Sequence, residues 1–204
     1  MTGILVVSGA AGVGKSTVLQ ACAANDDQLT PIVKGTTRPN RPGELNPDCV
    51  HDPELRPHSG DTKQVLIYSA NQNLYSINLD SVGKARQSRK RPAIIVSDAA
   101  TIDKLRNLFP GQVTVVFIHR DRTMESVREL VRTRLLIGAT VVPADLEEMV
   151  EAEAQARWAT REAIYDQLAS GELRPDHVVF NNGTITRAVR WMQRIIRESL
   201  APPA

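Results

Sequence analysis

The sequence predicts an α/β fold in which a parallel sheet is flanked by helices. Three observations support this prediction. Short apolar segments rich in Val and Ile alternate with longer amphipathic stretches, as expected of strands that are buried between helices. A glycine-rich loop directly follows the first apolar segment. The length of 204 residues suits one such domain with small insertions.

The individual elements follow from this pattern. Strands are expected at the short apolar runs, namely Ile4–Ser8, Val65–Tyr68, Ala93–Ser97, Val113–His119 and His177–Phe180. Helices are expected where apolar residues recur at helical spacing, namely Lys15–Ala24, Leu79–Ser88, Ala99–Leu108, Arg122–Arg134, Ala144–Ala169 and Thr184–Leu200. Residues Thr30–Thr62 contain six prolines and break the alternation, which predicts an irregular and functional loop.

Composition excludes several classes of protein. A net charge of +2 is too small for a protein that wraps nucleic acid or coats an acidic membrane. Cys22 and Cys49 lack metal-ligand spacing, which argues against a disulfide scaffold and against a zinc module. The apolar runs are too short to span a membrane, and the start of the chain does not resemble a signal peptide. We therefore expect a cytoplasmic protein with no nucleic-acid or membrane partner.

The loop GAAGVGKS at residues 9–16 matches the phosphate-binding pattern G-x-x-x-x-G-K-[ST], and it lies between an expected strand and an expected helix. Glycines allow successive backbone N–H groups to face phosphate oxygens, and the helix N-terminus adds its dipole. Lys15 is expected to contact the β- and γ-phosphates, and Ser16 to bind Mg²⁺. The nucleotide-binding residues predicted here are Gly9, Ala10, Ala11, Gly12, Val13, Gly14, Lys15, Ser16 and Thr17.

The loop alone does not decide where the phosphate goes. The chain has no N-K-x-D segment of a switch GTPase, and its apolar strands do not end in the Asp-Glu pair of a motor or transport ATPase. A small-molecule kinase remains, and it needs a second anionic site. The segment TTRPNRPGE offers one, because Arg38 and Arg41 could grip a phosphate with their guanidinium forks. Alternatively, the two arginines pair with Glu44 or face solvent.

With these two motifs, the chain resembles the guanylate kinase family. SGAAGVGKST resembles that family's phosphate loop, and TTRPNRPGE resembles its acceptor-phosphate segment at a similar spacing. Other segments match by order and spacing: Asn73-Leu74-Tyr75, RPAIIVSD, TVVFIHRD and HVVFNN. The resemblance spans most of the chain, and the first two motifs are its specific part.

The resemblance implies a P-loop NTPase-type sheet with two additions. The core would comprise residues 1–33 and 89–204, the acceptor-binding insertion about 34–88, and the lid about 128–151. MgATP would be the donor, and the acceptor would be a phosphorylated small molecule, by family default a nucleoside monophosphate such as GMP. The chain would act as a monomer or homodimer.

The resemblance also implies roles for particular residues. Charge on the transferred phosphoryl group would be neutralised by Lys15, Arg128 and Arg132. Asn181 would lie near the adenine. The acceptor would be bound by Arg38, Arg41, Glu44, Tyr75 and Asp98.

The chain departs from the family pattern where guanine is read. Lys34 replaces a serine, Leu66 a glutamate and Ile77 a small hydroxyl residue. A site without hydrogen-bonding partners for a base discriminates that base poorly, so we expect weak activity on GMP. Elsewhere, Val50 replaces a phosphate-binding tyrosine, Val96 an aspartate and Met149 a lid arginine, for which Arg134 or Arg157 could substitute.

Several alternatives remain open. The acceptor could be a sugar phosphate, as in ribose bisphosphate kinases, and Lys34 could then meet an additional phosphate. Residues of the insertion, such as Asp61, Asn71 or Gln72, could instead read a base from a new direction. A different class of function is a non-catalytic nucleotide-binding or interaction module on the same fold, although the intact Lys15-Ser16 pair argues against an idle scaffold.

Overall fold

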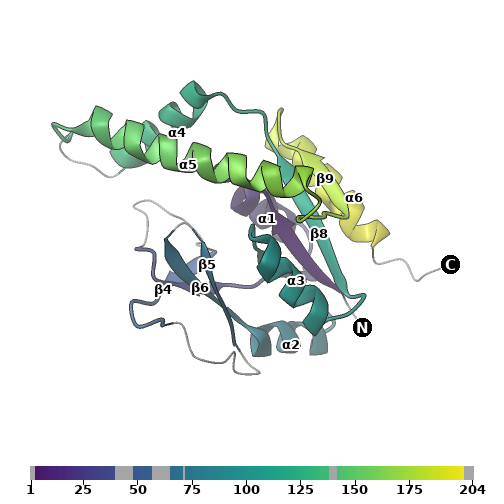
Figure 1. The fold of residues 1–204 in the computed structure, drawn as a ribbon. Coiled ribbons are helices and arrows are strands. Elements are labelled where there is room, and N and C mark those ends of the chain that lie inside the picture. The colour runs from purple at the N-terminus through teal and green to yellow at the C-terminus, as the bar shows by residue number, and fades with distance from the viewer. Residues whose placement is uncertain (1–2, 40–47, 57–64, 71, 138–141, 200–204) are drawn as a thin grey trace.

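The computed structural model describes residues 3–39, 48–56, 65–70, 72–137 and 142–199. Its main sheet is parallel and has the strand order β2-β7-β1-β8-β9, and a smaller sheet has the order β4-β3-β6-β5 (Figure 1). The main strands are β1 Ile4–Ser8, β2 Leu29–Pro31, β7 Arg91–Ile95, β8 Val113–His119 and β9 His177–Phe180. The smaller sheet contains β3 Lys34–Thr36, β4 Cys49–His51, β5 Val65–Ala70 and β6 Asn73–Asn78.

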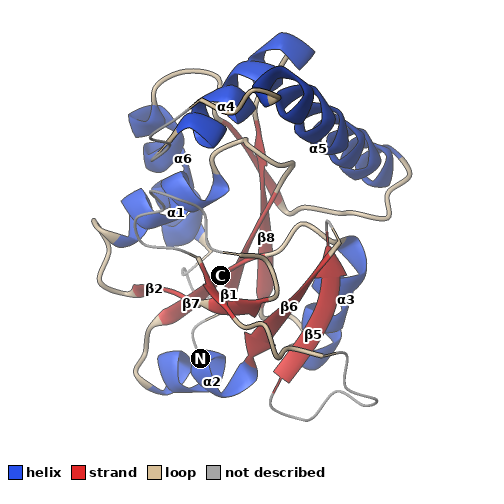
Figure 2. Cartoon of the chain, turned by 90° about the vertical axis from the view of Figure 1, so that its left-hand side faces the viewer, coloured by secondary structure: helices blue, strands red, loops and turns tan. Residues whose placement is uncertain are grey.

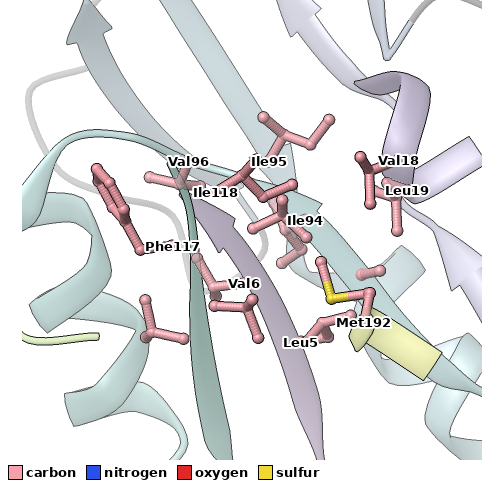
Figure 3. Close-up of a cluster of buried hydrophobic side chains, with 14 of the residues drawn as sticks. Leu5, Val6, Val18, Leu19, Ile94, Ile95, Val96, Phe117, Ile118 and Met192 are labelled. Carbon is pink, nitrogen blue, oxygen red and sulfur yellow. The ribbon is translucent and has the colours of Figure 1, made fainter. Parts of the chain in front are cut away.

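Strand β1 lies at the centre of the main sheet, and all five of its residues are buried there. Its neighbours supply buried β-branched side chains, and Val6 pairs with Ile94 of β7 and Val115 of β8. In the core, Val18 and Met192 come from helices packed against these strands (Figure 3). Burying each such side chain stabilises the fold by about 1.5–3 kcal/mol. This packed layer therefore holds β1 in place, and the glycine loop follows directly after β1.

The helices surround the main sheet and also form a pair at one end of the molecule. Helices α1 and α6 lie together on one side of the main sheet and α3 lies on the other, whereas α4 and α5 lie side by side at one end of the molecule (Figure 2). The α4–α5 pair has a small core of its own, built on Val127, Val131 and Val150. The helices are α1 Lys15–Ala23, α2 Leu79–Gln87, α3 Ala99–Leu108, α4 Met124–Leu136, α5 Leu146–Ala169 and α6 Ile185–Glu198. No helix among the described residues is long and apolar enough to cross a membrane.

The smaller sheet is an insertion between β2 and β7. Strand β3 pairs in parallel with β4 and antiparallel with β6, which also pairs with β5. Alternation along these strands places Lys34, Cys49, Tyr68 and Tyr75 on one face. Further along β5 and β6 on that face, Leu66 lies opposite Ile77, and both are buried in the main core.

The predicted fold class is confirmed, and most of its elements occur within two residues of their expected bounds. The strand expected at Ala93–Ser97 occurs instead at Arg91–Ile95. The expectation that residues 30–62 form an irregular loop is wrong in part, because β3 and β4 lie within this stretch. Each of these strands has only three residues, which is too short to show alternation in the sequence. Strand β6 was also missed, although its Asn73 and Tyr75 were recognised as a motif.

Candidate functional site

The glycine loop turns the chain from β1 into α1 at the carboxyl edge of the main sheet. Gly9, Gly12 and Gly14 have φ values of +136°, +79° and +93°, which L side chains rarely adopt. A Cβ atom on Gly9 would also lie 2.4 Å from the carbonyl oxygen of Ile118. The glycines therefore allow both the turn and its close approach to β8, and the loop ends at the N-terminus of α1, where an anion is favoured.

Lys15 lies folded over this loop. Its Nζ donates hydrogen bonds to the carbonyl oxygens of Gly9 at 2.7 Å and Ala10 at 2.8 Å. The hydroxyl of Ser97, two residues after β7, donates to the same Gly9 oxygen at 2.8 Å. The loop is thereby tied to the carboxyl end of a neighbouring strand, with an ammonium group over it.

A cleft of about 340 Å³ extends from the glycine loop to the smaller sheet and to helices α4 and α5. Its wall carries five cationic side chains and one carboxylate among the described residues: Lys15, Lys34, Arg38, Arg134, Arg157 and Asp48. The loop and α1 contribute Ala11, Gly12, Gly14, Ser16 and Thr17 as well. Gly9, Ala10 and Val13, also predicted to bind the nucleotide, are not among the lining residues. The surplus of positive charge suits phosphorylated ligands.

The predicted acceptor residues lie in different places. Arg38 and Tyr75 line the cleft, and the Tyr75 ring stacks on Tyr68 with a centroid distance of 5.4 Å. Arg41 and Glu44 lie outside the described residues. Asp98 is the N-cap of α3, where its Oδ2 accepts a hydrogen bond from the Thr101 backbone N–H at 2.7 Å. The cleft lining does not include Asp98.

Lys34 is a buried cation in the wall of the cleft, with 4% of its surface exposed. Its Nζ donates to the carbonyl oxygen of Ile95 at 2.7 Å and lies 3.7 Å from Oδ2 of Asp48. It also lies 5.1 Å from the centre of the Tyr75 ring. Burial opposes the charged form, but the nearby groups, Tyr68 foremost, outweigh burial and raise the pKa of Lys34. The raised pKa favours the ammonium form of Lys34.

Arg128 and Arg132 of α4, the two arginines predicted to act from a lid, bind glutamates of α5. Arg128 donates to Glu151 at 2.7 and 3.1 Å, and Arg132 donates to Glu147 at 2.7 and 3.2 Å. These bonds connect α4 to α5, and neither arginine is among the residues that line the cleft.

Arg134 and Arg157 line the cleft instead. Arg134 follows Arg132 by two residues, which turns it roughly 200° around α4. Arg157 also bonds Glu153 on its own helix at 2.5 Å. The spacing of arginines in the sequence therefore did not indicate which of them face the cleft, because that depends on how α4 packs against α5.

Asn181 is hydrogen-bonded to the backbone of the glycine loop. Its Nδ2 donates to the carbonyl oxygen of Val13 at 2.8 Å, and only 5% of its surface is exposed. A Cβ atom on Gly14 would lie 2.7 Å from the same nitrogen. Asn181, which directly follows β9, therefore connects that strand to the glycine loop. The sequence analysis predicted only that Asn181 would lie near the adenine.

Sequence reasoning missed Asp48, Cys49 and Tyr68 as residues of the cleft. Tyr68 could have been found from alternation in its expected strand. Asp48 and Cys49 gave no local signal, because their position depends on the pairing of Cys49 with Lys34. Burial raises the pKa of the Cys49 thiol, so it is a neutral group in this wall.

The residues fit a nucleotide-bound Mg²⁺ ion. No group of three His, Cys, Asp or Glu residues in the described part of the chain could hold a metal by itself. Mg²⁺ normally keeps several waters and binds through nucleotide phosphates with few protein ligands. The Ser16 side chain, beside Lys15 in the cleft wall, satisfies that smaller requirement.

In one cleft the glycine loop with Lys15 faces the cationic wall of the smaller sheet, an arrangement typical of P-loop kinases. The fold is shared with a solved structure of guanylate kinase from Anaplasma phagocytophilum, with a TM-score of 0.64, 17% identity, and coverage of 98% of this chain and 87% of that chain. A gluconokinase structure from Sinorhizobium meliloti 1021 has a TM-score of 0.48 and 20% identity, covering 96% of this chain and 92% of that one.

Sequence comparison gives a more specific relationship. No family model matches the chain. A guanylate kinase from Bdellovibrio bacteriovorus is 29% identical over 164 residues, which cover 78% of this chain and 85% of that protein. The chain is related to the guanylate kinase family, and the resemblance found in its motifs is confirmed.

Proposed function

We propose that this protein is an ATP-dependent kinase that transfers the γ-phosphoryl group to a small acceptor that already carries a phosphate. The observation that supports this most strongly is that one continuous cleft contains both Lys15 of the glycine loop and Arg38 and Tyr75 of the smaller sheet. A donor phosphate chain and an acceptor phosphate would therefore meet in the same cleft.

In this proposal the glycine loop binds the ATP phosphates. Backbone N–H groups of residues 9–17 face the phosphate oxygens. Lys15 gives up its hydrogen bonds to the loop carbonyl oxygens and binds the β- and γ-phosphates instead. Asn181 keeps the loop in place through its bond to Val13. Mg²⁺, held through the Ser16 hydroxyl, would supply further neutralisation of the phosphate charge.

Arg38 and Tyr75 bind the acceptor phosphate, with Arg41 and Glu44 proposed to assist from outside the described residues. An oxygen of this phosphate attacks the γ-phosphorus, the bond to the β–γ bridging oxygen breaks, and ADP leaves with that electron pair. Lys15, Arg134 and Arg157, which line the cleft, would neutralise charge on the transferred group. Arg128 and Arg132 would contribute only after exchanging their glutamate partners. Asp98 would support the acceptor side through the start of α3.

The proposed division of the chain follows the sequence prediction. The core comprises residues 1–33 and 89–204, and the insertion at about 34–88 carries the smaller sheet. The lid at about 128–151 contains parts of α4 and α5, and the separate apolar cluster of these helices would allow them to move as one piece. A cytoplasmic location and a monomeric or homodimeric state remain predictions.

The acceptor is by family default a nucleoside monophosphate such as GMP. Leu66 and Ile77, which replace two guanine-reading groups, are 2% and 0% exposed and belong to the main core. They provide no hydrogen bonds to a base. A sugar phosphate therefore remains the alternative acceptor, whereas Lys15 and Ser16, both retained in the cleft wall, argue against a module without catalytic activity.

A coupled assay of ADP release tests the proposal with MgATP and a panel of nucleoside monophosphates and sugar phosphates. The Lys15→Ala variant should lose turnover and ATP affinity, because its ammonium would face the β- and γ-phosphates. Lys84→Ala on the exposed side of α2 is the matched control and should behave as the wild type. Unchanged ATP affinity in Lys15→Ala would contradict the assignment of the glycine loop.

A further inference from the structure

Asp48 is the acidic residue among the described residues that line the cleft. Its side chain is 20% exposed, so it lies partly open to the cleft. A carboxylate repels the phosphate groups that the other charged residues attract. Its presence in this wall therefore calls for a role other than binding phosphate.

The position of Asp48 is fixed by β3 and β4. Its carbonyl oxygen accepts a hydrogen bond from the Lys34 backbone N–H at 3.1 Å, and the next residue pairs with Lys34 in the parallel ladder. Lys34 Nζ lies 3.7 Å from Oδ2, which exceeds the 2.7–3.2 Å of an N–H···O hydrogen bond. The ammonium lies beside the carboxylate but donates its hydrogen bond to the carbonyl oxygen of Ile95 at 2.7 Å.

The acceptor half of the cleft therefore presents two different groups. Arg38 supplies a guanidinium suited to a phosphate. Asp48 supplies two carboxylate oxygens that can only accept hydrogen bonds while ionised. The stacked rings of Tyr68 and Tyr75 line the same half. A ligand that satisfies both groups carries a phosphate and, in its other part, hydrogen-bond donors.

We propose that Asp48, positioned by Lys34, recognises the non-phosphate part of the acceptor through a pair of adjacent N–H or O–H donors. This inference rests on the proposed kinase function. Two kinds of acceptor present such a pair: a guanine base with its ring N–H and amino group, and a sugar with two neighbouring hydroxyl groups. A carboxylate binds either pair with its two oxygens, as it binds the fork of an arginine. Acceptors that offer only lone pairs at this position are rejected.

The test is a calorimetric titration of the protein loaded with a non-hydrolysable ATP analogue and Mg²⁺. Two matched pairs of acceptors are compared: GMP with IMP, which lacks the amino group, and ribose 5-phosphate with 2-deoxyribose 5-phosphate, which lacks one hydroxyl. The wild type should prefer the paired-donor member by about 10- to 100-fold in one of the two pairs, as expected for a hydrogen bond to a charged group. The pair that shows the preference identifies the kind of acceptor.

The variants connect that preference to Asp48. Asp48→Asn keeps the size of the side chain and should reduce the preference to below about threefold, because one oxygen becomes an N–H donor. Asp52→Asn is the matched control, since Asp52 lies in the same insertion but not in the cleft lining, and it should keep the wild-type preference. Lys34→Met should also reduce the preference, whereas a residue that only maintained the fold would weaken both members of a pair equally.

Two results would overturn the inference: a wild type that prefers neither paired-donor ligand, and a preference that survives in Asp48→Asn. Assays of ADP release with the same ligands separate this from the proposed function. Turnover without any preference would leave the kinase standing and refute the role of Asp48. A preference that depends on Asp48 without turnover of any acceptor would refute the kinase and leave the recognition site.

Discussion

The contact between Asn181 and the glycine loop gives a direct test of how the loop is held. Asn181→Ala removes the donor that bonds the Val13 carbonyl at 2.8 Å. Val13 has no exposed surface, so no water replaces the lost donor without rearrangement. A buried carbonyl left without a partner costs about 1–3 kcal/mol. For a chain of 204 residues this corresponds to a fall of roughly 2–12 °C in Tm.

Urea unfolding monitored by circular dichroism measures the change in the free energy of unfolding, and calorimetry measures the affinity for an ATP analogue with Mg²⁺. Affinity should also fall, because the loop N–H groups lose a fixed position. Asn25→Ala is the matched control: its Nδ2 donates to the Ala21 carbonyl at 2.7 Å, but this bond is exposed. The control should change stability by less than about 0.5 kcal/mol. Equal stability of Asn181→Ala and the wild type would show that this hydrogen bond does not stabilise the fold. Lost stability with unchanged nucleotide affinity would show that the bond does not position the glycine loop for binding.

Two further predictions follow from burial and from the lid. Burial raises the pKa of the Cys22 thiol from 9.0 to about 12. Between these pH values the folded state binds more protons than the unfolded state, so the free energy of unfolding falls as the pH rises. Urea unfolding at pH 8 and pH 10 should therefore show a fall in the free energy of unfolding that is about 1.4 kcal/mol larger in the wild type than in Cys22→Ala; the same pH dependence in both would contradict this prediction. In the lid, Arg134→Ala and Arg157→Ala should each lower kcat by about 10- to 1000-fold, and by more than Arg128→Ala or Arg132→Ala, whose side chains bind α5. Steady-state kinetics with saturating ATP decide this, and a larger loss in Arg132→Ala than in Arg134→Ala would restore the order expected from the sequence.

Local features of this protein were predictable from the sequence. The glycine loop, its preceding strand and its following helix depend on residues that are close together in the chain. For this reason the motif and both flanking elements occur where the sequence predicted them. Strands β1, β7 and β8 of the main sheet were recognised for the same reason, since each is a run of mostly buried apolar residues, whereas the three-residue strand β2 was missed.

The acceptor half of the cleft was predictable only in part. Arg38 and Tyr75 were found through motifs, but the proximity of Asp48 to Lys34 arises from the pairing of two three-residue strands. The choice between Arg132 and Arg134 depends on which side of α4 packs against α5, and the spacing of arginines does not reveal it. The expected guanine-reading positions Leu66 and Ile77 belong to the core, so the loss of polar groups there has a structural explanation.

Phosphorus NMR of the reaction mixture shows whether the γ-phosphoryl group of ATP is transferred onto a phosphate of the acceptor. With MgATP and a phosphorylated acceptor that the protein binds, we expect the ATP signals to be replaced by those of ADP while a new phosphoanhydride signal appears on the acceptor. With the Lys15→Ala variant, the signals of ATP and of the acceptor should stay unchanged. Conversion of ATP to ADP and inorganic phosphate alone, or unchanged ATP with every phosphorylated acceptor tested, would refute the proposed transfer.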